Sequence, residues 1–365
     1  MTQNIYKEFS EVLESPKYFP SVSLIIPIES KINQQTELEY KLKNVYHKIE
    51  ADLNKNYPPE KVIPVLQKLS KMIEQVNFQS NKKSIAIYVS PIMDRIFYLD
   101  VATEEKTVID DSFEIRDLIY NKKEDRKYFL LILSSKKIKY FECYNHHFKL
   151  LPSPVQDEIG FYTNDIAEKV TNFSDQSERK EILMDKFLMH ADHGLSELLQ
   201  TNKLSVFVTG TDRIIGHFKK ITKNSSSIRQ YVSGNFEETT QAELSLILDP
   251  VIKDWQKLKQ INLLKEMDQA LSHKKLACGI KEVWEAASQK RGRLLIVEKN
   301  YECPAQHSSE EDTIYIQNEI LNQPLFIKDA VDDVIEKVLH FGGDVEFVDD
   351  QMLFNYQHIA LIEYF

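Results

Sequence analysis

Glycine is scarce in this sequence, and its scarcity excludes several familiar kinds of site. The chain has 9 glycines among 365 residues. They form no Walker loop, no GxGxxG turn and no GxSxG elbow, and no HExxH pair occurs. These motifs place backbone or side chains around a phosphate, a nucleophile or a zinc ion. The sequence therefore gives no support to a nucleotide-binding loop or a standard hydrolase, and we predict no cofactor and no metal.

Long apolar runs and paired cysteines are also missing. The longest apolar runs, such as residues 22–26, have the length of a strand and not of a membrane span. The first ten residues include Lys7 and Glu8 and contain no apolar segment of a signal peptide. The 3 cysteines lie far apart, so we expect reduced thiols and not a disulfide framework. These features predict a cytoplasmic protein without a membrane partner.

The charge is unevenly distributed along the chain. The formal net charge is −10, which argues against wholesale coating of nucleic acid. Residues 120–140 nevertheless contain seven Lys or Arg against two acids, and residues 217–229 contain four and no acid. Residues 302–333 contain eight acids and one lysine. The pattern suggests two kinds of partner, although each run taken alone is also typical of a solvated surface.

The hydrophobic pattern predicts three α/β regions. The first has a strand at residues 21–28, helices at 36–53 and 60–76, and a strand pair at 84–90 and 95–101. Prolines 58 and 59 separate the two helices. A charged joint at 121–127 is expected to follow. The length of the chain fits two or three domains.

The middle region predicts an antiparallel meander of strands at 128–133, 138–144 and 148–151. A long polar segment then precedes a helix at 176–199, a strand at 204–210 and a helix at 212–221. A loop at 224–227 and a long helix at 239–264 follow. This order suggests a ribonuclease-H-like α/β layer.

The last third is the most regular. It predicts helices at 280–288 and 329–340 and strands at 292–298, 345–348 and 359–364. Gly342-Gly343 ends the second helix, as glycine does at a C-cap. Alternating helices and strands predict a small three-layer α/β sandwich.

The layout of the whole chain resembles the archaeal and eukaryotic class-1 release factors and Pelota, and most closely their bacterial homologues. The residues that carry the resemblance are the helix 331–340, Gly342-Gly343, the strands 345–348 and 359–365, and residues 279–283 before 294–297. The resemblance implies a multidomain α/β (α+β) fold with three domains. Residues 1–122 would form an N-terminal domain with a helical hairpin, and residues 123–256 a ribonuclease-H-like middle domain. Residues 257–365 would form a C-terminal α/β sandwich of the kink-turn-binding ribosomal protein type.

The chain departs from this family at the catalytic tip. The family's Gly-Gly-Gln corresponds here to Ser174, Asp175 and Gln176, so both glycines are replaced. A Cβ at each position and a carboxylate beside an anionic tRNA end oppose hydrolysis of the ester. Asp175 with Glu178 is also typical of a capping box that opens a helix. The decoding tetrapeptide Asn-Ile-Lys-Ser is missing from the hairpin tip as well.

Two basic segments are candidate RNA-binding sites. One is the hairpin tip, and the other follows the helix at 212–221, where His217 and Phe218 are mixed with lysines. The candidate residues are Asn54, Lys55, Lys61, Lys219, Lys220, Lys223 and Arg229. An exposed basic helix end remains an equally good interpretation of the second segment.

Two pairs of possible metal ligands were also considered. His190 and His193 are spaced for one side of a helix, but no third ligand is evident. Cys303 and His307 form a pair in an acidic loop, which is weak evidence for zinc.

These features predict a non-catalytic factor that binds ribosomal RNA in the ribosomal A site and acts in hibernation or rescue. The resemblance also implies a translational GTPase as a partner of the C-terminal domain. Two alternatives stay open. One is a peptidyl-tRNA hydrolase that uses Gln176, and the other is a stress-associated interaction protein that does not bind ribosomes.

Overall fold

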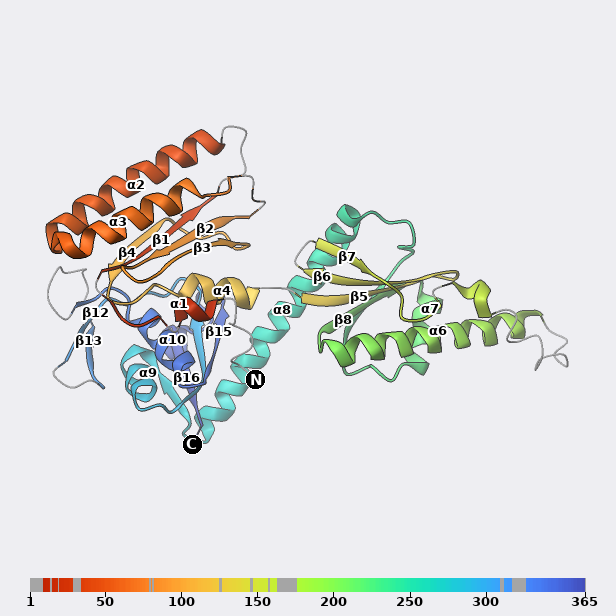
Figure 1. Cartoon of the computed structure of the whole chain (residues 1–365). Coiled ribbons are helices and arrows are strands. Elements are labelled where there is room, and N and C mark those ends of the chain that lie inside the picture. The colour runs from red at the N-terminus through yellow and green to blue at the C-terminus, as the bar shows by residue number, and fades with distance from the viewer. Residues whose placement is uncertain are drawn as a thin grey trace. The chain divides into compact units, whose positions relative to one another are not determined.

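The computed structural model divides the chain into two compact units (Figure 1). Unit 1 comprises residues 1–124 and 263–365, and unit 2 comprises residues 125–262. The structure describes residues 9–13, 15–18, 20–28, 34–78, 80, 82–124, 127–144, 147–156, 158–162, 176–308, 312–316 and 326–364. The divisions lie close to the predicted borders after residues 122 and 256, but the first and last predicted domains share one unit. Their separation into two domains stays a prediction.

The first sheet of unit 1 is antiparallel, in the order β3-β2-β1-β4. Its strands are β1 (Ser21–Pro27), β2 (Ser84–Val89), β3 (Asp94–Leu99) and β4 (Lys106–Asp110). Helices α2 (Gln34–Asn56) and α3 (Pro59–Glu74) cover one face (Figure 1). The other face packs against α1 (Ser10–Leu13) and α4 (Arg116–Glu124).

The periodicity of the sequence explains this packing. Residues 38, 42, 45, 49 and 53 of α2 recur at helical spacing, and all are buried. In β1, alternate residues point to opposite faces. Leu24 packs in the cluster under α2 and α3, whereas Ile25 packs in the cluster on the other side. Pro59 begins α3, where its missing N–H costs no helical hydrogen bond.

The second sheet of unit 1 has the order β10-β16-β11-β15. Its strands are β10 (Leu276–Cys278), β11 (Gly292–Glu298), β15 (Asp344–Val348) and β16 (Ile359–Glu363). Helices α9 (Gly279–Ser288) and α10 (Ala330–His340) pack on one face, and the end of α8 (Gln241–Ser272) packs on the other. The predicted three-layer α/β sandwich is therefore confirmed.

Gly343 has a steric reason to be glycine. A Cβ at this position would lie 2.7 Å from the Gly292 carbonyl oxygen and 2.7 Å from Val338 Cγ1. Gly342 before it has a φ of +84°, which other residues rarely adopt. The Gly-Gly pair therefore ends α10 and lets β15 start against β11. A small sheet of β12 (Ala305–His307), β13 (Ile314–Ile316) and β14 (Phe326–Ile327) and the short helix η4 (Phe354–Tyr356) complete the described part of this region.

Unit 2 contains one sheet in the order β7-β6-β5-β8-β9. Its strands are β5 (Lys127–Leu133), β6 (Ile138–Tyr144), β7 (His147–Leu151), β8 (Ser205–Gly210) and β9 (Ile228–Ser233). The first three are antiparallel, and β8 and β9 continue the sheet in parallel. Helices α6 (Gln176–Thr201) and α7 (Asp212–Ile221) cover one face, and the first part of α8 covers the other. This topology confirms the ribonuclease-H-like layer, and η3 (Ile159–Tyr162) packs beside α6.

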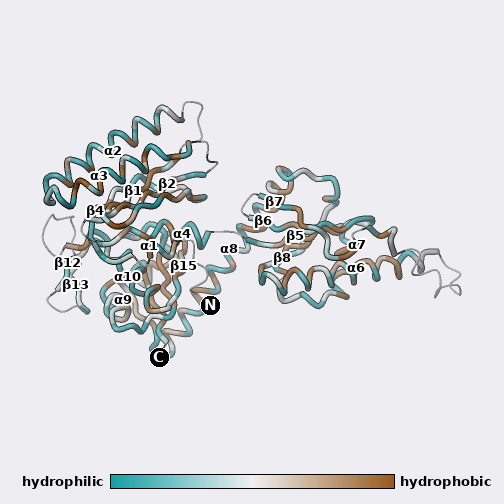
Figure 2. Tube along the Cα trace, viewed as in Figure 1, coloured by the Kyte–Doolittle hydropathy of each residue, from teal (hydrophilic) through white to brown (hydrophobic). Residues whose placement is uncertain are grey.

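Hydropathy follows the layers: Figure 2 shows apolar residues along the strands and hydrophilic residues along α2. Some elements escaped the sequence pattern, namely β4, α4, β9 and the short strands β10 and β12 to β14. The expected charged joint at 121–127 is wrong at its start, because residues 121–124 belong to α4. Asn121 there is buried, and its side chain accepts a hydrogen bond from the Asp100 N–H. Among the described residues, no helix combines the length and the apolar character needed to cross a bilayer.

Candidate nucleic-acid interface and buried polar junction

The second basic segment lies at the end of α7 and the start of β9 in unit 2. The side chains of Lys219, Lys220, Lys223 and Arg229 are all exposed. The Lys219 ammonium lies 4.5 Å from the centre of the Tyr231 ring. Cations at the end of a helix also suit its dipole, so a purely structural role explains part of this pattern. The arrangement presents positive charge beside an aromatic side chain, which suits contacts with an RNA backbone.

A buried aspartate fixes the loop between α7 and β9. Asp192 of α6 is 5% exposed, and its carboxylate accepts hydrogen bonds from three residues of this loop. The donors are the Thr222 hydroxyl at 2.5 Å, the Lys223 N–H at 2.9 Å and the Asn224 amide at 2.9 Å. Asn224 also donates to the Ser196 hydroxyl at 2.8 Å. The backbone at Lys223 is therefore held by α6, and the loop is pre-organised.

The predicted role of the aromatic residue in this segment is wrong. Phe218 is fully buried in the core of unit 2, so it is not available to stack on a base. His217 is also engaged, because its Nδ1 lies 2.8 Å from Asp185 Oδ1 on α6. The helical spacing of Ile214, Ile215 and Phe218 was the signal that Phe218 faces inward. Tyr231, which sequence reasoning missed, is the aromatic side chain beside the lysines.

The hairpin tip is the other predicted RNA-binding site, and it lies in unit 1. Asn54 and Lys55 belong to the last turn of α2, and Lys61 belongs to the first turn of α3. All three are exposed. The Lys61 ammonium lies 6.0 Å from the centre of the Tyr18 ring. The structure therefore brings these three residues to one end of the helical hairpin, as predicted, and their contact with RNA stays a prediction.

The loop tip of the middle region cannot be compared with its prediction. Ser174 and Asp175 lie outside the described residues. Gln176 is the first residue of α6, in agreement with the predicted start of that helix. The role of this tip, catalytic or otherwise, stays a prediction.

The two metal pairs find no further ligands in the described part of the chain. No group of three or more His, Cys, Asp or Glu side chains is placed there to hold a metal ion. His193 is exposed and lies 3.3 Å from Glu197 Oε1, one turn further along α6. The His307 ring packs edge-on against Trp284, with 5.7 Å between the ring centres.

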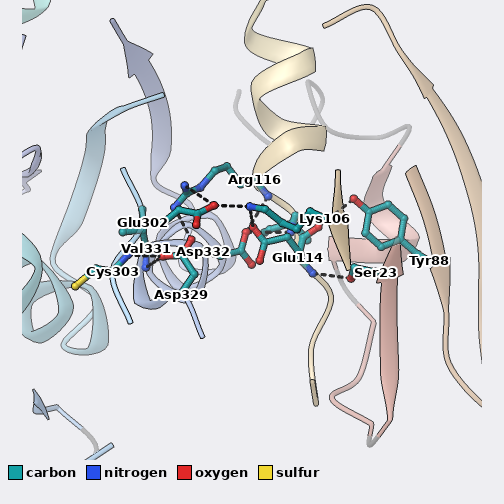
Figure 3. Close-up of polar contacts among 11 residues, drawn as sticks. Ser23, Tyr88, Lys106, Glu114, Arg116, Glu302, Cys303, Asp329, Val331 and Asp332 are labelled. Atoms are coloured by element: carbon teal, nitrogen blue, oxygen red, sulfur yellow. Dashed lines mark hydrogen bonds and ion pairs between the residues drawn. The ribbon is translucent and has the colours of Figure 1, made fainter. Parts of the chain in front are cut away.

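A second feature, which sequence reasoning missed, is a buried polar junction between the two sheets of unit 1 (Figure 3). Arg116 of α4 is 4% exposed, and its guanidinium donates to Asp329 Oδ2 at 2.6 Å. Asp329 caps α10, because its other oxygen accepts from the backbone of Val331 and Cys303. Asp332, in the first turn of α10, accepts from the backbone of Ile115 at 3.0 Å and Arg116 at 2.8 Å.

Glu114 and Lys106 extend the junction toward the first sheet. The Lys106 ammonium lies 3.3 Å from Glu114 Oε1 and 2.6 Å from Glu302 Oε1. The backbone of Glu114 donates to the Ser23 hydroxyl and accepts from Tyr88, as Figure 3 shows. Burial raises the pKa of Glu114 to about 7, although Lys106 opposes this shift. Burial also raises the pKa of Asp332 well above its usual range, and the charges of Glu114 and Asp329 add to the effect.

The junction corrects the interpretation of the acidic stretch 302–333. The charge run indicated either a second kind of partner or a solvated surface. Asp329 and Asp332 are instead buried, and Glu302 pairs with Lys106. Their partners, Lys106 and Arg116, lie some 200 residues earlier in the chain. Sequence spacing carries no signal for such a long-range pairing, so the charge run alone was misleading.

The middle of the chain matches the model of a known protein family. Residues 127–291 match the model of the family described as Bacterial archaeo-eukaryotic release factor family 3. The predicted likeness to bacterial homologues of the archaeal and eukaryotic release factors is thereby confirmed. The matched region includes all of α6, α7 and β9, and hence the basic segment of unit 2. No curated protein matches the chain significantly.

Solved structures match the chain only at low identity and low TM-score. Archaeal Pelota, from a model of ribosome-bound archaeal Pelota and ABCE1, is 11% identical with a TM-score of 0.44. That alignment covers 100% of this chain and 94% of Pelota. Dom34 of S. cerevisiae is 14% identical with a TM-score of 0.39, over 75% of this chain and 74% of Dom34. The archaeal termination factor aRF1 is 13% identical with a TM-score of 0.25, over 100% of this chain and 98% of aRF1. Because these scores are low, the functional argument rests on the family match and on the surface of unit 2.

Proposed function

We propose, from the release-factor family match over residues 127–291, that this chain is a non-catalytic ribosome-binding factor. Unit 2 would contact ribosomal RNA through the basic surface formed by Lys219, Lys220, Lys223 and Arg229. The hairpin tip of unit 1 would contact the decoding region of the small subunit in the A site. The role would be to occupy idle ribosomes, in hibernation or rescue, and not to terminate translation.

The observation that carries this proposal is the basic segment 217–229, which runs from the end of α7 to the start of β9 through a loop held by Asp192. A protein of net charge −10 repels RNA on average, so binding requires a local surface of the opposite sign. The segment 217–229 has four cations and no acid, and Asp192 holds its backbone in place. Because the loop is already ordered, little conformational entropy is lost when phosphates bind.

The non-catalytic part of the proposal rests on the sequence at the loop tip. Ser174 and Asp175 stand where the family has two glycines, and a carboxylate next to the peptidyl-tRNA ester would repel the negative charge that develops on the ester carbonyl oxygen. A translational GTPase is proposed as the partner of the C-terminal region, as the resemblance implies.

The test is co-sedimentation of the purified chain with vacant 70S ribosomes in sucrose gradients at several salt concentrations. Comigration at low salt that decreases as salt rises is expected, since phosphate contacts release counterions. Charge reversal of Lys219, Lys220 and Lys223 to Glu should weaken binding by at least about tenfold and reduce the salt slope by about one for each lost contact. Wild-type protein that stays at the top of the gradient even in cell extract would refute the proposal.

A matched control separates the local surface from net charge. Exposed Lys265, Lys274 and Lys281 lie in the C-terminal part of unit 1, outside both proposed RNA-binding segments. Their reversal to Glu changes the net charge by the same amount and should leave most of the binding intact. Equal losses in the two triple variants would mean that overall charge, and not this surface, drives association.

The hydrolase alternative is tested in the same preparation. Peptidyl-tRNA bound to ribosomes should not be hydrolysed by the wild-type chain. Peptide release that disappears in Gln176→Ala would replace the non-catalytic role with an enzymatic one, whatever the sedimentation result.

A further inference from the structure

The polar side of α10 faces a cavity of about 450 Å³ within unit 1. Its core side carries Val331, Val334, Ile335 and Val338, all of which are buried. Its other side carries Asp333, Glu336, Lys337 and His340, which recur at helical spacing and line the cavity. The polar side of a surface helix is ordinarily solvated. Here Leu13, Ser15, Pro16 and Lys17 also line the cavity.

The remaining walls of the cavity are mostly apolar. Trp284, Phe341, Leu13 and Pro16 contribute hydrophobic surface, and His307 and Ser15 contribute polar atoms. Ligand sites in proteins are typically apolar hollows of about 300–1,000 Å³ with a few placed polar groups. The volume here is at the low end of that range, so it suits a small molecule and not a nucleotide-sized one.

One charged pair at the cavity is already neutralised. The Lys17 ammonium lies 3.9 Å from Glu336 Oε2, which joins the Leu13–Lys17 segment to α10. This pair closes one side of the cavity and leaves neither charge in need of a ligand.

Two opposite charges at the cavity, Lys337 and Asp333, form no salt bridge within the described part of the chain. The Lys337 ammonium donates to the Ser288 hydroxyl at 2.9 Å and lies 3.4 Å from the centre of the Trp284 ring. Among the described residues, no carboxylate lies within ion-pair distance of it, and no donor reaches the Asp333 carboxylate. Burial lowers the pKa of Lys337 to about 8 and raises the pKa of Asp333 to about 7. In each case burial outweighs the opposite charges nearby, which are Lys17 and Lys337 for Asp333 and chiefly Asp333 for Lys337.

We infer that this cavity binds a small zwitterion, an α-amino acid with an apolar side chain. Lys337 receives the carboxylate and Asp333 receives the ammonium group, because the two side chains are one helical turn apart, with about 5–6 Å between their Cβ atoms. The apolar side chain of the ligand packs against Leu13, Pro16 and Phe341. A ligand with both charges satisfies both protein groups, whereas a simple anion or cation leaves one of them buried and unpaired.

Trp284 provides a direct readout of binding. The chain has 2 tryptophans, and Trp255→Phe leaves Trp284 at the cavity as the single tryptophan, whose emission is excited selectively. The full-length Trp255→Phe protein is titrated with L-leucine, with N-acetyl-L-leucine, which lacks the ammonium group, and with L-leucinamide, which lacks the carboxylate. A saturable change with leucine is expected, and each blocked compound should bind at least about tenfold more weakly.

Variants of the two charged residues identify which group each one receives. Lys337→Met should weaken leucine binding strongly while leaving leucinamide little changed. Asp333→Asn should weaken leucine binding strongly while leaving the binding of N-acetyl-L-leucine little changed, because that compound has no ammonium group. Lys290→Met is the control, since Lys290 contacts Phe341 but does not line the cavity. Circular dichroism confirms that each variant is folded.

Two outcomes overturn the inference. One is the absence of a saturable signal with leucine, methionine and valine at millimolar concentration, checked by calorimetry. The other is equal binding of leucine and its blocked analogues, which would make the cavity a nonspecific apolar site. Neither outcome bears on ribosome binding, so this inference and the proposed function are tested separately.

Discussion

Each unit contains a buried aspartate that holds a distant segment of the chain, and the two differ in their surroundings. Asp192 in unit 2 accepts hydrogen bonds from residues 222–224, all of them neutral donors. Asp332 in unit 1 accepts from the backbone of Ile115 and Arg116, but Glu114, Asp329 and Arg116 also surround it. A buried aspartate therefore fixes a distant segment in both units. Neutral donors surround Asp192 in unit 2, whereas charged groups surround Asp332 in unit 1.

The difference shows how each unit is assembled. In unit 2, helices pack their apolar sides on both faces of one sheet. The buried Asp192 of that unit orders a surface loop. In unit 1 two sheets that are distant in sequence meet, and a charged cluster forms part of the contact between them. A buried ion pair is weak evidence for net stability, but breaking one leaves an uncompensated charge. Unit 1 should therefore be the more sensitive to single polar substitutions and to pH.

The largest effect is expected from Arg116→Ala. Removing the guanidinium leaves the buried Asp329 without its ion-pair partner, and loss of one partner of a buried pair typically costs about 3–5 kcal/mol. Unfolding of unit 1 is followed by Trp284 fluorescence in a Trp255→Phe background, and that of unit 2 by Trp255 in a Trp284→Phe background. Unit 1 should lose stability while unit 2 changes little. A loss below about 1 kcal/mol would mean that the junction is structurally dispensable.

An intermediate effect is expected from Asp192→Ala, within unit 2. The hydroxyl of Thr222, the N–H of Lys223 and the amide of Asn224 lose their acceptor, which should cost about 2 kcal/mol. Hydrogen exchange at residues 222–224 should accelerate far more than exchange in the strands. Ribosome binding should also weaken, because the backbone at Lys223 would no longer be held in place. Unchanged exchange in this loop would contradict the role assigned to Asp192.

The smallest effect is expected from Asp333→Asn, and it depends on pH. Burial raises the pKa of Asp333 to about 7, while Lys17 and Lys337 oppose the shift and Glu336 and Asp110 add to it. A carboxyl group whose pKa is higher in the folded state than in the unfolded state binds more protons when folded. Its contribution is complete below the unfolded pKa near 4 and is lost as the pH rises through about 7.

The wild-type chain should therefore lose stability between about pH 4 and pH 7, and Asp333→Asn should flatten part of that decline. The expected difference at pH 8 is about 1 kcal/mol, read from chemical unfolding at several pH values. Asp312→Asn serves as a control near the same surface. A decline of equal slope in Asp333→Asn and wild type would assign the pH dependence to other groups, such as Glu114.

Periodicity and turn chemistry predicted most of the elements and the layers they form. The spacing of Leu38, Leu42 and Val45 predicted α2, and Gly342-Gly343 predicted the end of α10, since both signals are local. Strand β9 was missed because only Ile228 of its residues is fully buried, so it lacks a regular apolar alternation. Lys219, Lys220 and Lys223 were predicted to form a basic segment from the composition of the sequence alone. Tyr231 beside them was not, because it belongs to a strand that pairs with β8 and is brought near by the fold.

Local patterns in the sequence are sufficient to predict most of the helices and strands, the ribonuclease-H-like order of the middle region and the positions of the basic segments. These follow from side-chain size, charge and spacing over a few residues. The burial of Asp329 and Asp332 beside Arg116 arises only in the tertiary fold. The same is true of the cavity that the polar side of α10 lines together with Leu13, Ser15, Pro16 and Lys17. The physical reason is that the protonation and partners of a charged group depend on its burial and on neighbours far away in the chain, which no local pattern records.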